Sequence, residues 1–277
     1  MGSIITLTTD FGTADGYVAS MKGVILSINP QAIIVDISHS IEPQNIFQAA
    51  FILSTVYPYF PEGTIHLAVV DPGVGSRRKA IILKTETALF VAPDNGILSY
   101  EIEESGKVHG KPARQIPATA ELRKLSPGLE AVEIANPEYR QHPVSSTFHG
   151  RDIFAPAAAH LSLGVPPQKF GDAISQVHVF PIPLPYKNAS GDIVGRVLHI
   201  DHFGNLITNV RSGDMPAGNA TVIIGKHRVQ GLSGFYAHTS GLSAIIGSSG
   251  YLEISLKNGS AAEFLGAKVG HEVRLEA

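Results

Sequence analysis

The sequence contains no cysteine, and this absence excludes several kinds of chemistry at once. Disulfide bonds, cysteine-ligated zinc, iron–sulfur clusters and thiol nucleophiles are all excluded. No apolar run approaches the roughly 20 residues needed to cross a bilayer. The N-terminal Met-Gly-Ser leads straight into a short apolar stretch, without the basic leader of a signal peptide. We therefore expect a soluble cytoplasmic protein with no membrane partner.

Charge is also scarce, since only 16% of the residues are charged and the net charge is −3. No dense Lys/Arg run occurs, so we expect no nucleic-acid partner. Hydrophobic residues make up 44% of the 277 residues, a balance typical of a compact globular protein. The chain is long enough for one large domain or two moderate ones.

Several familiar cofactor and catalytic motifs are missing. Gly73-Val74-Gly75 lacks the third glycine of a dinucleotide fingerprint, and Gly225-Lys226 lacks the upstream glycine of a P-loop. No Gly-x-Ser-x-Gly elbow occurs. The twelve histidines include no His-Glu-x-x-His or comparable spacing. The sequence therefore indicates neither a cofactor nor a metal.

The first 70 residues alternate between strand and helix patterns. A short β-rich run occurs at Ile4–Thr8, and apolar runs of strand length occur at Ala32–Ile37 and Thr64–Val70; we expect these strands to be buried. Apolar residues recur at helical spacing between them, over 17–28 and 46–56. Strand and helix in this order predict parallel βαβ units.

The middle of the chain carries less regular signals. We expect the following features in order: a hairpin of Ala80–Lys84 with Ala88–Val91, a turn at Asp94-Asn95-Gly96, a mostly surface excursion over about 103–146, an alanine-rich helix over Asp152–Leu163, and an extended linker at Phe180–Pro185.

After the linker the pattern changes to short alternating runs separated by glycine turns. These runs are Ile193–Ile200, Ala220–Gln230, Ser243–Ile246 and Tyr251–Leu256. They predict a small antiparallel β-barrel or sandwich. The predicted fold class is α/β, with an N-terminal α/β domain (1–185) around a largely parallel central sheet and a smaller C-terminal antiparallel β-barrel domain (186–277).

Polar clusters follow several predicted strands. Asp10 and Asp71 are informative because open parallel sheets bind ligands beyond the carboxyl ends of their strands. The clusters are Thr9-Asp10-Phe11-Gly12 with Asp15 and Tyr17, Asp71-Pro-Gly-Val-Gly-Ser-Arg-Arg78, Ser146-Thr-Phe-His-Gly-Arg-Asp152, Asp201-His-Phe-Gly-Asn205, and Gly247-Ser-Ser-Gly-Tyr251. Each cluster alone is equally well explained as a helix cap or a turn.

Taken in order, these five motifs resemble the S-adenosylmethionine hydrolase (hydroxide adenosyltransferase) family, which is related to fluorinating and chlorinating enzymes that act on the same substrate. The likeness runs from residue 4 to about residue 275 and is interrupted mainly over 103–146. It implies S-adenosylmethionine as substrate, with no further cofactor. It also implies a homotrimer with sites between one subunit's N-terminal domain and a neighbour's C-terminal domain.

The resemblance implies three catalytic residues. Asp71, Arg78 and His149 match a trio shared by the hydrolases, whereas the halogenases carry tyrosine at the positions of Asp71 and His149. The trio therefore favours water as the nucleophile. We expect Asp71 to orient the water, Arg78 to hold that carboxylate in a charge-assisted bond, and His149 to make the water's other hydrogen bond. Gly150 does not discriminate, because the chlorinase also has glycine there.

The resemblance also implies a substrate-binding set. Asp10 matches the acceptor of both ribose hydroxyl hydrogen bonds, and Gln44 lies where the halogenases place a tryptophan over the ribose. The other matches are Asp15 and Asp201 near the methionine ammonium, Ser248 and Ser249 at the methionine carboxylate, Phe203 and Asn205 at the adenine, and Thr147 and Phe148 around C5′, with Tyr17 beside Asp10. Ser249 replaces an arginine of the halogenases.

Three other functions stay open at this point. One is a halide-dependent 5′-halo-adenosine synthase, which the Asp-Arg-His trio disfavours. A second is a non-catalytic adenosine or S-adenosylmethionine sensor, which would have no use for a polarised water. A third is a metal-dependent hydrolase built from His149, Asp152, His160 and Asp201, although their spacing does not fit a known ligand pattern.

Overall fold

The protein divides into two compact units. In the computed structural model, residues 2–106, 111–112, 115–116, 119–216, 220–234 and 241–276 are described. The first unit comprises Met1–Val108 and Thr119–Phe180, and the second comprises His109–Ala118 and Pro181–Ala277. The predicted boundary at residue 185 stays a prediction.

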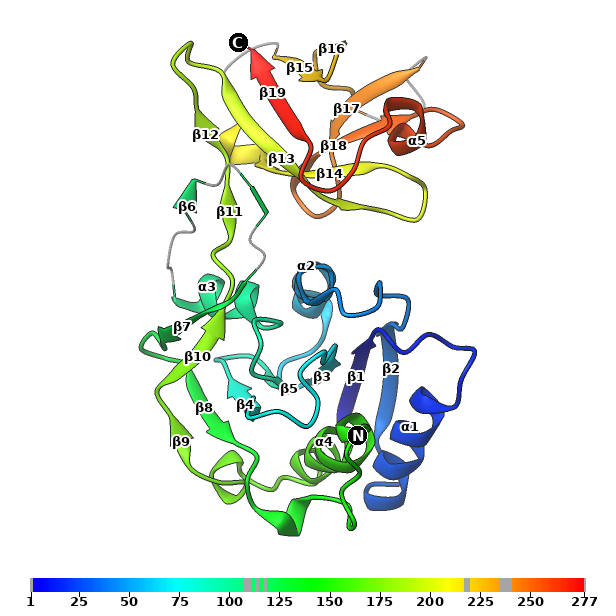
Figure 1. The fold of residues 1–277 in the computed structure, drawn as a ribbon, viewed down its shortest axis with the longest axis vertical. Helices are drawn as coiled ribbons and strands as arrows, with labels where there is room; N and C mark the ends of the chain where they lie inside the picture. Colours follow the sequence, from blue (N-terminus) through cyan, green and yellow to red (C-terminus); the bar gives the residue numbers. More distant parts are fainter. Residues whose placement is uncertain are drawn as a thin grey trace. The chain divides into compact units, whose positions relative to one another are not determined.

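A seven-stranded sheet forms the centre of the first unit (Figure 1). Its strands, in spatial order, are β2 (Ile33–Ser38), β1 (Ile4–Thr9), β3 (Ile65–Val69), β5 (Leu89–Pro93), β4 (Ala80–Lys84), β8 (Glu130–Glu133) and β9 (Ala173–Ile174). Strands β2, β1, β3 and β5 are parallel to their neighbours in this group, and the pairs from β5 through β9 are antiparallel. The predicted α/β class and the hairpin of β4 and β5 are confirmed, in a sheet that is mixed.

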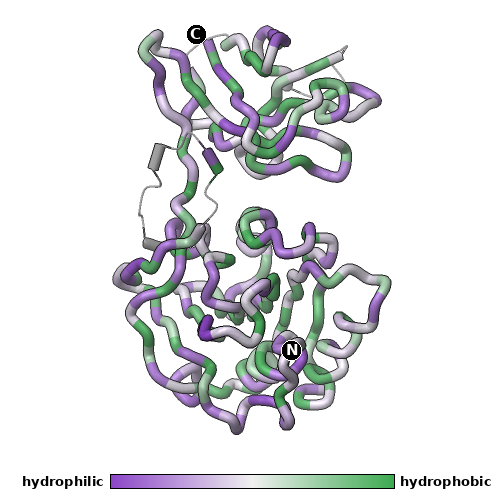
Figure 2. Tube along the Cα trace, in the orientation of Figure 1, coloured by the Kyte–Doolittle hydropathy of each residue, from purple (hydrophilic) through white to green (hydrophobic). Residues whose placement is uncertain are grey.

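Helices cover both faces of this sheet. Alternation along β3 places Leu67 and Val69 in one core cluster and Ala68 and Val70 in the other. The first cluster includes residues of α1 (Tyr17–Ile28) and α4 (Ala155–Ser162), and the second includes residues of α2 (Ile46–Val56) and α3 (Ser99–Gly106). Figure 2 shows hydrophobic stretches along these central strands. Both faces are buried, which explains why the strand sequences read as continuous apolar runs.

The remaining elements of the first unit are short. They are the antiparallel pair β7 (Glu121–Lys124) and β10 (Gln176–Val179), the 3₁₀ turns Tyr57–Tyr59, Pro137–Tyr139 and Pro167–Lys169, and a π-helical turn at Gly150–Phe154.

Two sequence predictions for this unit are wrong in part. Residues 103–146 were expected to form mostly a surface excursion. Strand β8, which belongs to this stretch, lies instead inside the sheet and buries Ala131 and Val132. Two buried residues between two glutamates are too short a pattern to indicate a strand. In addition, β2 is half exposed, with Ile33 at 48%, because it is the edge strand of the sheet.

The second unit is an antiparallel, barrel-like sheet. Its strands follow the order β16 (His227–Gln230), β15 (Thr221–Ile224), β19 (Glu272–Glu276), β13 (Ile193–Ile200), β14 (Leu206–Arg211), β18 (Tyr251–Leu256) and β17 (Leu242–Ile246), with β12 (Tyr186–Lys187) on β13. Ser233, just after β16, donates its N–H to the Ala244 carbonyl in β17 at 2.8 Å, so the two ends of the path approach each other. The predicted antiparallel barrel is confirmed.

The second unit also contains a short helix, a 3₁₀ turn and a short strand pair. Helix α5 (Ala261–Leu265) begins at the cap Ser260 and ends at Gly266. A 3₁₀ turn spans Ser212–Asp214, and β11 (Pro183–Leu184) pairs in parallel with β6 (Lys111–Pro112). The predicted linker is therefore extended, but it is partly paired.

Glu101 in α3 is a fully buried carboxyl group to which no other described residue donates a hydrogen bond. Burial raises its pKa well above the ordinary 4.5. A raised folded-state pKa gives stability that is complete below the unfolded pKa and is lost as pH rises toward the folded pKa.

We therefore expect the variant Glu101→Gln to unfold at a higher urea concentration than the wild type at neutral pH, but not at pH 4. The difference should grow by up to about 1.4 kcal/mol per pH unit between the two pKa values. The control Glu62→Gln changes an exposed glutamate that does not contribute to the raised pKa of Glu101, and it should track the wild type. A difference that does not depend on pH would contradict a buried neutral Glu101.

None of the described helices combines the length and the apolar character required to cross a membrane.

Candidate active site

A cavity of about 620 Å³ opens at the carboxyl ends of β1 and β3 in the first unit. Asp10 follows β1 directly and Asp71 lies two residues after β3. Because these two strands are parallel neighbours, their ends meet at one edge of the sheet, as the sequence predicts. The cavity is lined by Asp10, Phe11, Tyr17, Pro43, Gln44, Val69, Asp71, Pro72, Val74, Thr147, Phe148, His149 and Gly150.

Asp71, Arg78 and His149 form a contiguous hydrogen-bonded trio. Arg78 donates from Nε to both carboxylate oxygens of Asp71, at 2.8 and 3.0 Å, and from Nη2 to Oδ2. The same Nη2 lies 3.1 Å from Nδ1 of His149. Since a guanidinium only donates, Nδ1 accepts and the proton of a neutral imidazole is on Nε2. The trio is therefore ordered, with the N–H of His149 on Nε2.

The loop after β3 carries two members of this trio, Asp71 and Arg78. Two tight turns, from Asp71 to Val74 and from Gly73 to Ser76, are closed by main-chain hydrogen bonds, and the Ser76 hydroxyl accepts the N–H of Arg78. The Arg78 guanidinium lies over the Phe154 ring, 5.0 Å from its centroid. The Asp71 and Arg78 side chains are only 6% and 11% exposed, so their charge-assisted bond is well shielded from water.

The environment of His149 favours its neutral form. Burial lowers the pKa of His149 below 6.5, and the positive charge of Arg78 lowers it further. Asp71 acts in the opposite direction and does not outweigh them. A neutral imidazole at pH 7 agrees with the hydrogen bond that Nδ1 accepts from Arg78.

The loop before His149 is closed by Asp152. Its buried Oδ2 accepts the N–H of Ser145 at 2.8 Å, and the Ser145 hydroxyl accepts the N–H of Phe148 at 3.0 Å. The helix predicted to begin at Asp152 begins earlier, at the π-helical turn Gly150–Phe154. The prediction was wrong because Asp152 does not cap the helix. It lies inside the helix and ties down the preceding loop.

The Asp10 side chain is oriented by a residue that lies just before helix α2. The backbone N–H of Gln44 donates to Asp10 Oδ2 at 2.8 Å. Gln44 has φ = 67°, an unfavourable left-handed conformation for a non-glycine residue. Asn45 follows it and caps α2 by accepting the N–H of Gln48. The start of α2 thus orients Asp10.

Aromatic rings form one side of the cavity. The centroids of Phe11 and Phe148 are 5.8 Å apart, and those of Tyr17 and Phe148 are 5.1 Å apart, in edge-to-face contacts. Phe11 was quoted in the sequence motif but was not among the predicted binding residues. Its place directly after Asp10 was the available signal.

Six predicted residues line this cavity and Arg78 adjoins it, but Asp15 does not. Asp15 is exposed and is absent from the cavity wall. The other five predicted binding residues, Asp201, Phe203, Asn205, Ser248 and Ser249, belong to the second unit.

In the second unit, Asp201 closes its own turn. Its Oδ1 accepts the N–H groups of Phe203 (2.9 Å) and Asn205 (2.8 Å), and its Oδ2 accepts the Asn205 side-chain amide at 2.9 Å. The Phe203 ring is 74% exposed. The backbone of this turn is therefore held by hydrogen bonds, and its aromatic ring is exposed on the surface of the unit.

Ser248 and Ser249 lie exposed in the turn between β17 and β18. Ser212, which follows β14, donates to the Gly250 carbonyl in this turn, whereas Asn205 precedes β14. The two turns thus lie at opposite ends of β14, roughly 20 Å apart at strand spacing. Within one unit, they do not come together around the same functional group.

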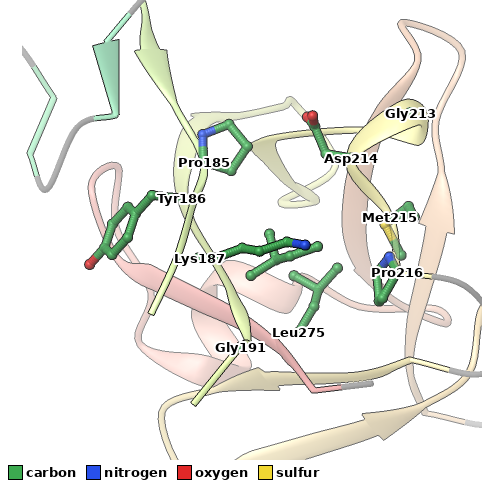
Figure 3. Close-up of a pocket in the computed structure, with 10 residues that line it drawn as sticks. Pro185, Tyr186, Lys187, Gly191, Gly213, Asp214, Met215, Pro216 and Leu275 are labelled. Carbon is green, nitrogen blue, oxygen red and sulfur yellow. The ribbon is translucent and has the colours of Figure 1, made fainter. Parts of the chain in front are cut away.

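A second cavity, of about 540 Å³, lies in the second unit (Figure 3). Lys187 extends across it, above an apolar wall that includes Met215 and Leu275. It contains none of the predicted site residues.

Across the described ranges, with their gaps, no group of three or more histidine, aspartate or glutamate side chains is arranged to hold a metal ion. The combination of His149, Asp152, His160 and Asp201 does not form such a group there.

Comparison with known proteins places the chain in a family. Residues 5–171 match the model of the SAM hydroxide adenosyltransferase N-terminal domain, and residues 195–274 match that of the C-terminal domain. Proteins named (R)-S-adenosyl-L-methionine hydrolase are similar. That of Thermus thermophilus is 38% identical, covering 96% of this chain and 97% of its own. That of Salinispora tropica is 34% identical, covering 99% and 97%.

More distant similarity extends to halogenating enzymes. A fluorinase of Actinoplanes sp. is 29% identical, covering 76% of this chain and 73% of its own. A crystal structure of a Thermotoga maritima protein superimposes with a TM-score of 0.85 at 34% identity, covering 99% of this chain and 100% of that one. Because the two domain models together match most of the sequence, this chain belongs to the SAM hydroxide adenosyltransferase family.

Proposed function

We propose that the protein hydrolyses S-adenosylmethionine, transferring the adenosyl group to water to give adenosine and L-methionine. The observation that carries this proposal is the trio at the cavity, in which Arg78, just outside the wall, holds Asp71 on the wall beside a neutral His149. Membership of the SAM hydroxide adenosyltransferase family and similarity to named hydrolases support it.

The leaving group explains why no acid is needed. Water oxygen forms a bond to C5′ while the C5′–S bond breaks, and the electron pair goes to sulfur. Sulfur leaves as a neutral thioether and needs no proton. The site has to hold one water in line with the C5′–S bond, and such positioning supplies on the order of 7–11 kcal/mol. The neutralisation of charge favours a partly desolvated cavity.

The geometry suggests a distinct role for each member of the trio. The Nε2–H of neutral His149 donates to the water oxygen and fixes its position. Asp71 accepts a hydrogen bond from the water and takes its proton as the new C–O bond forms. Arg78 holds the Asp71 carboxylate at two points, so that it cannot rotate away.

Substrate binding combines both units in this proposal. Asp10 accepts hydrogen bonds from the ribose hydroxyls, with Thr147, Phe148 and Tyr17 around C5′. Asp15 and Asp201 contact the methionine ammonium. Phe203 and Asn205 contact the adenine. Ser248 and Ser249 are left out of the proposed site, because their turn lies at the other end of β14 from Asp201. We place these second-unit groups on a neighbouring subunit of a cytoplasmic homotrimer, which light scattering after size-exclusion chromatography would reveal as three times 29.4 kDa.

The epimer at sulfur is part of the proposal. Similar proteins are named for the (R)-sulfonium form, and we propose the same preference here. The enzyme should consume the (R) epimer and leave the (S) epimer when given a mixture of both.

Because a fluorinase is among the similar proteins, attack on C5′ by a halide ion is the alternative to attack by water. The test is to incubate the protein with S-adenosylmethionine in EDTA, with and without chloride or fluoride, and to separate the products by chromatography. Equal amounts of adenosine and methionine, independent of halide and chelator, are expected. A halogenated nucleoside, loss of activity in EDTA, or binding without product would each overturn the proposal.

The lowered pKa of His149 sets the pH dependence of turnover. Because the neutral imidazole is needed, kcat should stay constant as pH falls through 6.5 and should decline only at lower pH, where His149 becomes protonated. The variant His149→Gln should be slower and should lack this acidic decline. A wild-type inflection at or above pH 6.5 that the variant retains would contradict the role of His149.

A further inference from the structure

The turn Asp94-Asn95-Gly96 lies at the same edge of the sheet as the candidate active site. It follows β5, which runs parallel to β3, so the two carboxyl ends are adjacent. None of its residues lines the cavity. The contacts of this turn are directed instead at the two ends of the loop that carries Asp71 and Arg78.

Asn95 bonds the first end of that loop. Its side-chain amide donates to the Val70 carbonyl at 2.9 Å, and its own Oδ1 accepts the N–H of Ile97 at 3.2 Å. Val70 is fully buried, just beyond the end of β3. A buried carbonyl in that place needs a donor, and the Asn95 side chain supplies it.

This bond acts on Asp71 through a rigid unit. The Val70 carbonyl and the Asp71 nitrogen belong to one planar peptide group, so rotation of that plane turns the Asp71 backbone with it. The Asp71 carboxylate then moves relative to Arg78 and His149. Asn95 thereby fixes the direction from which Asp71 faces the cavity.

Asp94 secures the other end. Its N–H donates to the Lys79 carbonyl at 2.9 Å, one residue after Arg78. Its buried carboxylate accepts the N–H and Nδ1–H of His178 in β10, at 2.7 and 2.8 Å. Consecutive residues thus tie both ends of the loop to a fixed point of the sheet.

We propose that Asn95 is a positioning residue of the reaction, which orients Asp71 through the Val70 peptide without touching the substrate. This inference rests on the proposed function, because it assumes that Asp71 orients the attacking water. Loss of the bond should then slow the chemical step more than it weakens substrate binding.

Two variants test the inference. Asn95→Asp keeps the acceptor for Ile97 but loses the donor to Val70, and Asn95→Ala loses both. Asn29 provides a matched control, because its amide also donates to one partner (Ser162, 2.8 Å) and its Oδ1 accepts an N–H two residues ahead (Gln31, 3.1 Å). Asn29→Asp and Asn29→Ala therefore remove the same kind of bonds away from the loop.

Steady-state kinetics below each variant's melting temperature give the readout. Both Asn95 variants should lose about 10- to 100-fold in kcat, with KM changed by less than about threefold, while both Asn29 variants keep kcat within about twofold. Unchanged kcat in the Asn95 variants, or equal losses in all four, would overturn the inference while wild-type turnover keeps the proposed function. A wild type without turnover would overturn the proposed function itself, and with it this inference.

Discussion

Asp71→Asn should lower kcat for S-adenosylmethionine hydrolysis about 10³-fold while KM stays within a few-fold, since an amide cannot take the proton of the attacking water. The substitution preserves volume. One oxygen remains to accept from Arg78 Nε, so the loop should stay in place. Arg78→Ala should show the same pattern, because it frees the Asp71 carboxylate to rotate. Single-turnover kinetics with saturating enzyme would separate the chemical step from binding.

A matched control for Asp71→Asn is Glu103→Gln. The Glu103 carboxylate is also shielded and pairs with an arginine, Arg123, at 2.6 Å, but it does not line the cavity. This control should retain wild-type kcat even where its melting temperature falls. Losses of equal size in kcat and KM for Asp71→Asn would contradict the role given to Asp71.

Asp10→Asn should have the opposite signature, with KM raised about 100-fold and kcat changed much less. Hydrogen bonds to a charged group contribute ~1.5–3 kcal/mol each, and the ribose hydroxyls lose an ionised acceptor in this variant. The remaining amide oxygen still accepts the N–H of Gln44, so the start of α2 keeps its position. Binding of adenosine, measured by calorimetry, should weaken to a similar degree.

Glu130→Gln is the control for that measurement. Glu130 lies on β8, is 55% exposed and pairs with Lys84 outside the cavity. An exposed pair of this kind contributes at most about 1 kcal/mol, so adenosine affinity should not change. If Asp10→Asn binds adenosine as the wild type does, Asp10 does not bind the ribose.

The parts of the fold that were predicted correctly are those with a strong local pattern. Strands β1 and β3 are rich in apolar and β-branched residues and are followed within two residues by aspartate, and α1 and α2 have clear helical spacing. Strand β8 was missed because only Ala131 and Val132 face the core. Strands β14 and β19 were missed because their few apolar residues adjoin polar turns. Their place depends on pairing with distant strands.

In the candidate site, likewise, some features could be predicted from the sequence and others could not. The trio could be predicted because Asp71, Arg78 and His149 lie in motifs at the ends of elements, where side-chain identity carries the information. The backbone groups that support Asp10 and the trio could not be predicted. The N–H of Gln44 and the carbonyl of Val70 are backbone groups, present at every non-proline residue, and only the folded chain decides which side chain they meet.

Attack of water on C5′ leaves the water oxygen in adenosine, so hydrolysis in oxygen-18 water distinguishes this reaction from every alternative. The protein is incubated with S-adenosylmethionine in labelled water containing chloride, and the masses of both products are measured by mass spectrometry. One oxygen-18 is expected in adenosine, at the 5′ hydroxyl, and none in methionine. Unlabelled adenosine, label in the sulfur-containing product, or a 5′-chloro nucleoside would contradict it.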